Sequence, residues 1–319
     1  MSDGDLSVEL EGLLALLQRR REGGKDVLPC VVGPTASGKT ALALALADAL
    51  DGEVVGADSV QIYRRFDKAT GKPSADERAR VPHHLVDVAD PLEPFDAARF
   101  VRMADAAIAD VRARGRTPIV CGGTFLWVKA LISGLSEAPA ADQAVRARHR
   151  AIVETEGREG LHARLRVVDP AMADRLHPND VLRTGRALEV FEVSGKRLSE
   201  LQAAHGFRVA RHDALLITPA RTMDDLSVRI HARVRGFLED GLVDEVKILL
   251  ADGLRAARAM GSVGYKETVL HVDGALSEED LHGAIVRASR VFARRQRTWL
   301  GHEPVHVVGT SEPQETASP

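Results

Sequence analysis

The residues that most directly suggest chemistry lie in the stretch VVGPTASGKT, residues 31–40. Gly33, four further residues and then Gly38-Lys39-Thr40 match G-x-x-x-x-G-K-[ST], the pattern of a phosphate-binding loop. In such a loop the backbone N–H groups and a helix N-terminus face an anion, a lysine reaches the terminal phosphates and a hydroxyl holds magnesium. The pattern does not say whether the phosphates belong to ATP or to another ligand. The loop residues that we expect to hold the phosphates are Gly33, Pro34, Thr35, Ala36, Ser37, Gly38, Lys39 and Thr40, with Mg²⁺ on Thr40.

Two further polar groups follow apolar runs. Asp58 comes after EVVGA, at the carboxyl end of a predicted strand, and ligands of open parallel sheets bind beyond that edge. A carboxylate there can take a proton or bind magnesium through water, and an aspartate that caps a turn is an equally good interpretation. The run TPIVCGGT ends in two glycines and Thr124, where kinases and ATPases often carry an acid for magnesium. This weakens a phosphoryl-transfer interpretation and favours a diphosphate that is bound as a leaving group or product.

Arginines gather in two segments near the end of the chain. In RIHARVR, Arg229 and Arg233 are four residues apart and share one face of a predicted helix. The segment RASRVFARRQRTW holds five more, and four of them share a face. Such a stripe suits a diphosphate or an RNA backbone, although a run of charge is by default a solvated face. The arginines of the second segment are Arg287, Arg290, Arg294, Arg295 and Arg297, of which Arg295 lies off the shared face.

The elements that must position these residues alternate between strands and helices, which predicts a parallel α/β sheet. Residues 67–94 hold glycine, prolines and charges and are expected to be mainly loop. The strands that we expect lie at 27–32, 52–59, 117–123 and 214–220. The helices that we expect around them lie at 6–20, 41–50, 95–114, 222–239, 242–251, 264–271 and 277–299.

The alternation stops in the middle of the chain, where four helical segments follow one another without a strand. We therefore predict a P-loop core domain over 28–138 and 205–308, interrupted by a helical insertion at 139–204. Residues 1–27 form an N-terminal extension that either packs on the core or stays mobile, and 309–319 form a disordered tail. The helices expected in the insertion lie at 142–155, 159–167, 170–176 and 180–204, the last broken at Ser194-Gly195.

Composition excludes several classes of protein. The chain has 319 residues, a net charge of −3 and 45% hydrophobic residues, so any nucleic-acid surface must be local. Two cysteines, Cys30 and Cys121, cannot form a disulfide framework or a four-cysteine zinc site, and we expect packed thiols. The N-terminus lacks the features of a signal peptide and no apolar run approaches 18 residues. We therefore expect a soluble, cytoplasmic protein that acts as a monomer.

Seven segments in this order closely resemble the tRNA dimethylallyltransferases, also called tRNA isopentenyltransferases, over roughly residues 30–300. The phosphate loop is shared with many families, whereas the combination of the second, fourth and seventh segments is much more specific. The resemblance is to the bacterial type of the family, and it implies a P-loop NTPase-like parallel sheet flanked by helices, with an all-helical insertion domain. The segments are GPTASGKTALALALA, ADSVQIYRRFDKATGKPS, PHHLVDVADP, CGGTFLWVKALISGL, HPNDVLRTGRALEVFEVSGK, MGSVGYKE and RVFARRQRTWL.

The resemblance also implies a reaction, in which a dimethylallyl group moves from dimethylallyl diphosphate to the exocyclic N6 amine of the adenosine 3′ of a tRNA anticodon. The loop then holds the prenyl diphosphate, with Mg²⁺ as the only cofactor. Asp58 matches the general base of the family, Arg233 its catalytic arginine and Thr124 a threonine that contacts substrate. Arg229 would help to bind the diphosphate.

The remaining matches concern RNA. The family's RNA contacts fall on the turn after Asp58, on the insertion and on the GSVGYK segment. Leu182 departs from the family, which often has glutamine there, so this contact is the least secure. The residues expected to bind tRNA are Ser59, Val60, Gln61, Arg146, Leu182, Arg183, Thr184, Gly185, Arg186, Gly261, Ser262, Val263, Gly264, Tyr265 and Lys266.

Three alternatives stay open. An adenylate isopentenyltransferase would use the same chemistry on a free nucleotide, but it needs no clasp like the helical insertion. A small-molecule kinase of the P-loop type would need an acid at Gly122-Gly123. A nucleotide-binding module without catalysis would depend on Lys39 but not on Asp58.

Overall fold

The fold was analysed in a computed structural model, which describes residues 3–24, 26–206 and 210–309. The chain forms two compact units, one of residues 1–132 with 211–319 and one of residues 133–210. The sequence predicted the helical insertion at 139–204, and the second unit is six residues longer at each end. The predicted disordered tail lies almost entirely outside the described residues.

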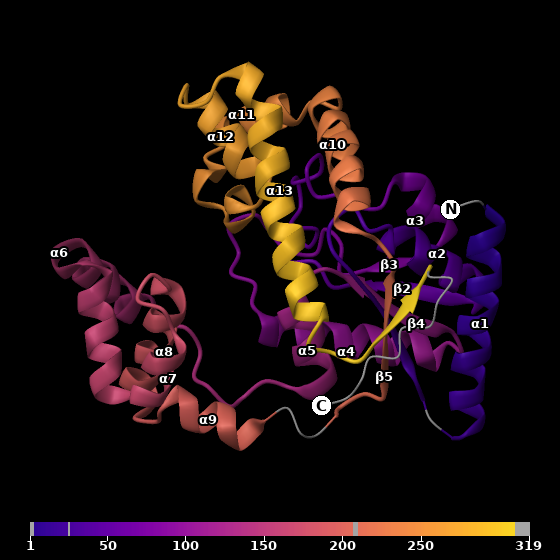
Figure 1. Ribbon diagram of the computed structural model, residues 1–319, viewed down its shortest axis with the longest axis horizontal. Helices are drawn as coiled ribbons and strands as arrows, with labels where there is room; N and C mark the ends of the chain where they lie inside the picture. The colour runs from indigo at the N-terminus through magenta and orange to yellow at the C-terminus, as the bar shows by residue number, and fades with distance from the viewer. Residues whose placement is uncertain (1–2, 25, 207–209, 310–319) are drawn as a thin grey trace. The chain divides into compact units, whose positions relative to one another are not determined.

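The first unit is built on a parallel sheet in the order β3-β2-β4-β1-β5-β6 (Figure 1). The predicted strands are confirmed, and the α/β fold class with them. Two strands were not predicted, because β3 has only two residues, inside a segment expected to be loop, and β6 only four. The strands are β1 Leu28–Val32, β2 Gly52–Gly56, β3 His83–His84, β4 Thr117–Gly122, β5 Ala214–Pro219 and β6 Val305–Val308.

Helices cover both faces of this sheet. On one face α1 and α2 pack against apolar side chains of the strands, and on the other α4, α5 and the helices after β5 share the larger core. Leu13 and Leu17 of α1 are fully buried, so the N-terminal extension packs on the core. The helices of this unit are α1 Asp3–Glu22, α2 Lys39–Ala49, α3 Ala75–Arg80, α4 Ala97–Ala113, α5 Phe125–Ser133, α10 Met223–Glu239, α11 Leu242–Ala251, α12 Tyr265–Val272 and α13 Glu278–Leu300, with short 3-10 turns η1 Leu254–Ala256 and η2 Arg258–Gly261.

The second unit is entirely helical where it is described, as predicted. Its first helix bends at Gly157, where a φ of 75° interrupts the helical backbone and matches the gap expected between two helices. The predicted break after Ser194 is a helix end, with Gly195 in the left-handed region. The unit has a small core of its own. Its helices are α6 Gln143–Val168, α7 Pro170–Arg175, α8 Val181–Ser194 and α9 Leu198–His205.

A buried carboxylate ties together the strands at one side of the sheet. Glu53 in β2 is 1% exposed and accepts hydrogen bonds from His84 Nε2 (2.7 Å), Arg114 Nη2 (2.8 Å) and Arg116 Nη1 (2.9 Å). Chiefly because of the Arg114 hydrogen bond, the pKa of Glu53 falls to about 2. The ionised form is therefore the one that stabilises the fold.

We expect Glu53→Gln to lower the free energy of unfolding at pH 7 by about 3 kcal/mol, because it breaks a buried ion-pair network by removing one partner. The folded-state pKa is depressed, so the contribution is full above the unfolded pKa of about 4.3 and is lost as pH falls toward about 2. Urea denaturation at pH 7 and at about pH 3 measures both quantities.

The matched control is Asp110→Asn, which removes an exposed carboxylate from the same Arg114. This variant should lower the free energy of unfolding by less than about 1 kcal/mol. Equal losses for the two variants, or a Glu53→Gln deficit that does not shrink in acid, would contradict this role for Glu53.

Candidate active site at the phosphate loop

The phosphate loop lies between β1 and α2, as the sequence predicts. Ala36 and Gly38 adopt left-handed backbone conformations, with φ of 64° and 93°, and such turns aim successive N–H groups into an anion-binding hollow. Gly33 is required for packing, because a Cβ there would lie 2.7 Å from Ser37 Oγ. The first turn of α2 adds N–H groups that have no partner within the helix.

A pocket of about 460 Å³ opens beside this loop, within the first unit. Lys39, Arg229 and Arg233 bring three cationic side chains to it, and Arg229 Nε is anchored on the carbonyl oxygen of Ala36 (2.7 Å). Burial, followed by the nearby Arg233 charge, lowers the pKa of Lys39. The charge of the pocket thus suits a multiply charged anion. Its lining residues are Ala36, Gly38, Lys39, Thr40, Ala41, Glu77, Arg229, Ala232 and Arg233.

Asp58 interacts electrostatically with two of these cations, Lys39 and Arg233. Its charge raises the pKa of both Lys39 and Arg233 against the lowering effect of burial. Asp58 Oδ1 also accepts the N–H groups of Val60 (2.9 Å) and Gln61 (3.3 Å). Oδ1 therefore caps a turn, which is one of the two interpretations of the sequence, while Oδ2 has no hydrogen bond within the described residues.

Thr124, just after the end of β4, fixes that same turn. Its Oγ1 accepts the N–H of Ser59 (2.9 Å) and lies 3.2 Å from Ser59 Oγ. The approach of the two strand ends is very close, since a Cβ on Gly122 would lie 2.1 Å from the carbonyl oxygen of Ala57. Glycine at position 122 is therefore what allows Thr124 to reach the Asp58 turn.

Sequence reasoning missed Gln296. Its side chain in α13 is 4% exposed, accepts the N–H of Thr35 through Oε1 (2.8 Å) and donates through Nε2 to the carbonyl oxygen of Gly123 (2.9 Å). One amide thus joins the phosphate loop to the loop after β4. The helical spacing of the buried Ser289 and Ala293 would have placed position 296 on the inner face, but the surrounding arginines drew attention to the outer one.

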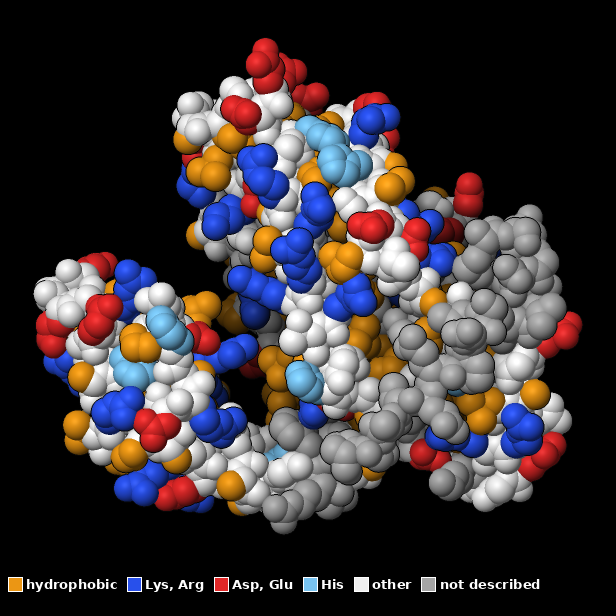
Figure 2. Space-filling model, in the orientation of Figure 1, with side chains coloured by type: hydrophobic (Ala, Val, Ile, Leu, Met, Phe, Trp, Pro, Cys, Tyr) orange, Lys and Arg blue, Asp and Glu red, His pale blue; other side chains and the backbone are white. Residues whose placement is uncertain are grey.

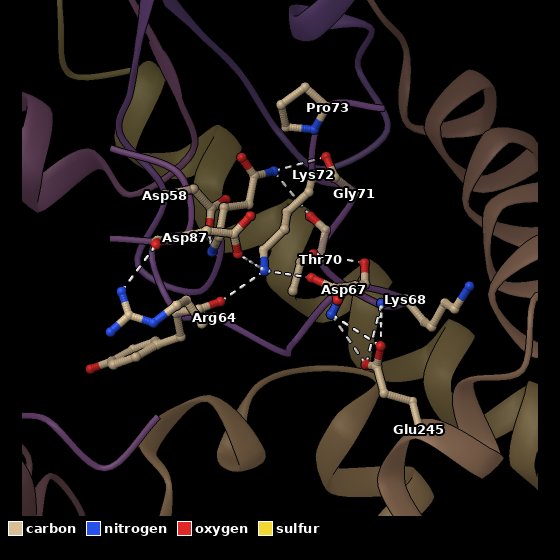
Figure 3. Close-up of polar contacts among 12 residues, drawn as sticks. Asp58, Arg64, Asp67, Lys68, Thr70, Gly71, Lys72, Pro73, Asp87 and Glu245 are labelled. Atoms are coloured by element: carbon tan, nitrogen blue, oxygen red, sulfur yellow. Dashed lines mark hydrogen bonds and ion pairs between the residues drawn. The ribbon is translucent and has the colours of Figure 1, made fainter. Parts of the chain in front are cut away.

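The loop over residues 67–73, part of which is drawn in Figure 3, contacts Arg233 through the carbonyl oxygen of Thr70. Arg233 Nη2 lies 3.4 Å from the carbonyl oxygen of Thr70, and its guanidinium lies 5.1 Å from the ring centre of Phe237. A Cβ on Gly71 would lie 2.2 Å from Arg233 Nη2, so only glycine leaves room for this arginine. Gln61 Nε2 donates to the carbonyl oxygens of Thr70 (3.1 Å) and Gly71 (2.9 Å) and holds the same loop from inside.

Two charged residues hold the other parts of this loop. The Lys72 side chain is 5% exposed and its Nζ bonds the carbonyl oxygen of Tyr63 (2.8 Å) and Asp67 Oδ1 (2.6 Å). Glu245 of α11 accepts the N–H groups of Asp67 and Lys68 (Figure 3). The loop is therefore held near both of its ends by contacts within the protein.

The predicted RNA residues of the first unit separate into exposed and buried groups. Lys266 is exposed and Ser262 and Val263 are half-buried. Gly264 is buried, and Tyr265 is 0% exposed, with its ring against Phe66 and its hydroxyl bonded to Glu245. Tyr265 is thus a core residue rather than an RNA contact, because its aromatic ring completes the packing around the 67–73 loop.

The predicted RNA residues of the second unit divide in the same way. Glu189, 0% exposed, binds Arg146 Nε (2.8 Å) and Arg186 Nη1 (2.7 Å), which fixes two predicted RNA-binding arginines in half-exposed positions. Arg183 and Leu182 are exposed at the start of α8, and Gly185 is half-buried. Thr184 is 1% exposed and faces the core, so its side chain offers nothing to RNA.

Comparison with known proteins decides the family. The family model described as IPP transferase matches residues 61–303, and one described as isopentenyl transferase matches residues 27–87. The chain belongs to the IPP transferase family. It is therefore a prenyltransferase, and the relationship assigned from its motifs is confirmed.

Several relatives match most of the chain. The tRNA dimethylallyltransferase of Sorangium cellulosum is 59% identical over 87% of this chain and 88% of its own length, and that of Geobacter sulfurreducens 45% identical over 88% and 91%. The crystal structure of the tRNA isopentenylpyrophosphate transferase from Bacillus halodurans matches with a TM-score of 0.65 and 36% identity, over 89% of each chain. A eukaryotic dimethylallyltransferase acting on tRNA matches with a TM-score of 0.72 and 27% identity, over 86% of this chain and 69% of that one. Among the described residues, none of the helices combines the length and apolar character that a membrane span requires.

We expect Gln296→Met to lower kcat for prenyl transfer by about 10² fold, since it keeps the volume but releases two loops whose alignment sets the reacting geometry. Gln296→Glu can still accept from Thr35 but places a second acceptor oxygen against the Gly123 carbonyl oxygen, so its kcat should be no higher than that of Gln296→Met. Steady-state kinetics measure this, with thermal unfolding as the check on folding.

Thr298→Val serves as the control, because this exposed threonine on the same helix bonds only the Arg294 carbonyl oxygen among the described residues. It should keep wild-type kcat. A wild-type kcat in Gln296→Met would show that the bridge does not align the site.

Proposed function

We propose that this prenyltransferase moves the dimethylallyl group of dimethylallyl diphosphate onto the N6 amine of the adenosine 3′ of a tRNA anticodon and releases diphosphate. The observation that carries the proposal is that Asp58 follows β2 and interacts electrostatically with Lys39 and Arg233, two of the cations that line the phosphate-loop pocket. Relatives that match most of this chain carry the name tRNA dimethylallyltransferase, which supports tRNA as the acceptor.

The chemistry needs a base and a stabilised leaving group. The N6 nitrogen attacks C1 of the dimethylallyl group while the bond from C1 to the diphosphate oxygen breaks. Asp58 takes the proton that the amine loses, and the electron pair of the broken bond leaves with the diphosphate. Lys39, Arg229 and Arg233 stabilise this growing negative charge, which is the role of preorganised cations in such sites.

The pocket also fits a magnesium ion bound mainly by the substrate. Thr40 lines the pocket at the first turn of α2, and Mg²⁺ usually takes one or two protein ligands together with phosphate oxygens and water. Within the described residues no group of three or more His, Cys, Asp or Glu side chains forms a separate metal site. The ion would neutralise charge on the diphosphate, and Thr40 is the residue that would hold it.

The acceptor adenosine must leave its stack, because its reacting amine is otherwise out of reach. We assign its contacts to Ser59 and Val60, which follow the base Asp58, and to the exposed residues of the RNA segments. Arg183 and Lys266 are the most exposed cations among the predicted RNA contacts. Arg146 and Arg186 present guanidinium groups that Glu189 has already oriented.

We expect Asp58→Asn to lower kcat for transfer by about 10² to 10⁴ fold, the range for loss of a positioned general base. The amide oxygen can still accept from Val60 and Gln61, so the turn and the affinity for inorganic diphosphate with Mg²⁺ should change little. Transfer of radiolabel into tRNA and calorimetric titration with diphosphate measure the two effects.

Lys39→Ala should show the opposite pattern to Asp58→Asn. Its main effect should be weaker binding of diphosphate, because Lys39 lines the pocket. Asp58→Asn with normal turnover would remove the carboxylate from the mechanism. Unchanged diphosphate affinity in Lys39→Ala would refute the assignment of the loop.

A further inference from the structure

The segment that follows β3 contains two strained residues. Leu85 and Asp87 both have left-handed backbone conformations, with φ of 61° and 57°. Such conformations are uncommon outside glycine, and each has an energetic cost that the surrounding contacts must offset. The buried side chain of Leu85 packs in the larger core. Asp87 is instead held by polar contacts, one set on its backbone and one on its side chain.

The backbone of Asp87 is joined to the turn that contains Asp58, the base of the proposed reaction. The N–H of Asp87 donates to the carbonyl oxygen of Gln61 (3.1 Å), and two residues later Ala89 forms an isolated parallel bridge with Tyr63. Gln61 in turn donates its own N–H to Asp58 Oδ1 (3.3 Å). The position of Asp87 is therefore fixed relative to the base.

The side chain of Asp87 is joined to the loop that contacts Arg233. Its Oδ1 binds Lys72 Nζ (Figure 3), and its Oδ2 accepts a hydrogen bond from Arg78 Nη1 (2.9 Å). Lys72 directly follows Gly71, the residue that leaves room for the Arg233 guanidinium. Asp87 thus connects the turn of the base with the loop of the catalytic cation.

The ion pair between Asp87 and Lys72 is mostly shielded from water. Charged side chains cover much of the surface, as Figure 2 shows for one face, whereas the side chains of Lys72 and Asp87 are only 5% and 28% exposed. Such pairs are screened by salt much less than surface pairs are. This contact can therefore hold the loop firmly.

The other partners of Lys72 are weaker anchors. Asp67 Oδ1 lies 2.6 Å from Lys72 Nζ, but the Asp67 side chain is 57% exposed and belongs to the same loop. The carbonyl oxygen of Tyr63 also accepts from Lys72 Nζ (2.8 Å), but it has no net charge. Among the described residues, Asp87 is therefore the one charged group outside the loop that binds Lys72.

Stability alone does not explain this arrangement. The cost of removing two charges from water offsets much of the attraction within a buried ion pair. The left-handed backbone of Asp87 adds a further cost. What the contacts achieve is a fixed geometry between two parts of the site that lie far apart in the sequence, Asp58 and Arg233.

We propose that Asp87 is a positioning residue for prenyl transfer, which anchors the loop that contacts Arg233 to the turn of the base. The proposal rests on the function proposed above. Asp87 does not line the pocket, so it acts through Lys72 and the loop and not on the ligand. Correct placement of Arg233 matters most in the transition state, where the charge of the leaving group develops.

The test is Asp87→Asn, because asparagine also accepts left-handed conformations and the backbone can stay as it is. The amide keeps only one acceptor oxygen and has no charge, so the Lys72 contact weakens. In steady-state kinetics with unmodified tRNA, kcat should fall by about tenfold, a part of the roughly 10²-fold that a misplacement of 1 Å can cost. The KM for dimethylallyl diphosphate should change by less than about twofold, because Lys39 and Arg229 still line the pocket.

A double-mutant cycle separates positioning from stability. In an Arg233→Gln background, Asp87→Asn should lower kcat by less than about twofold, because the group that it positions is already absent. Lys72→Met keeps the length of the side chain and should give the same loss as Asp87→Asn, without adding to it. A full tenfold loss in the Arg233→Gln background would overturn the proposal.

The matched control is Asp90→Asn, the same substitution three residues farther along the segment. The Asp90 carboxylate pairs with Arg64 at the surface (2.6 Å) and contacts no residue of the 67–73 loop within the described residues. This variant should keep the wild-type kcat. Equal losses of kcat in Asp87→Asn and Asp90→Asn, or a wild-type kcat in Asp87→Asn with a lower Tm, would show that Asp87 serves only the fold.

Two further outcomes are kept distinct. If the wild-type protein transfers no prenyl group to tRNA, the proposed function itself fails, whereas an active wild type with a fully active Asp87→Asn variant refutes only the role of Asp87. If Asp87→Asn does not fold, as judged by circular dichroism, Lys72→Met replaces it, with the same expected dependence on Arg233.

Discussion

The constraint on which this structure depends is a concentration of positive charge that must be held in place without being neutralised. Lys39, Arg229 and Arg233 converge on one pocket, and burial lowers the pKa of Lys39. Their fixed partners are mostly backbone carbonyls, since Arg229 bonds Ala36 and Arg233 bonds Thr70. Carbonyls orient the cations without cancelling their charge, so the attraction remains available to an anionic ligand.

The surrounding fold supplies the rigidity that such a site needs. Gln296 links the phosphate loop to the end of β4, and Thr124 links that end to the turn that contains Asp58. The phosphate loop, the end of β4 and the Asp58 turn, which are far apart in sequence, are thereby held in fixed positions relative to one another by two side chains. The loop that receives Arg233 is held separately, by Lys72 and Glu245. Asp58, the phosphate loop and the cations of the pocket are thus each held by side-chain and backbone contacts of the protein.

Sequence reasoning found the local features, because a strand, a glycine-rich turn and a helix leave a signature within ten residues. It also placed Asp58 correctly after the second strand, because the apolar run before it ends there. It missed Gln296, whose role depends on two partners more than 170 residues away. It also assigned Thr184 and Tyr265 to RNA from motif position, although both are buried, because a motif does not say which of its members face inward. The short strands β3 and β6 hold too few residues to show a pattern.

The most direct test of this account gives the wild-type protein radiolabelled dimethylallyl diphosphate and magnesium, with either unmodified tRNA or AMP as acceptor. We predict that label enters tRNA and not AMP, and that ATP is not hydrolysed. Label in AMP alone would agree with the roles given to the catalytic residues but would show that the acceptor is a free nucleotide and not tRNA. Transfer to neither acceptor, together with ATP turnover, would contradict the account and make the pocket that of a kinase.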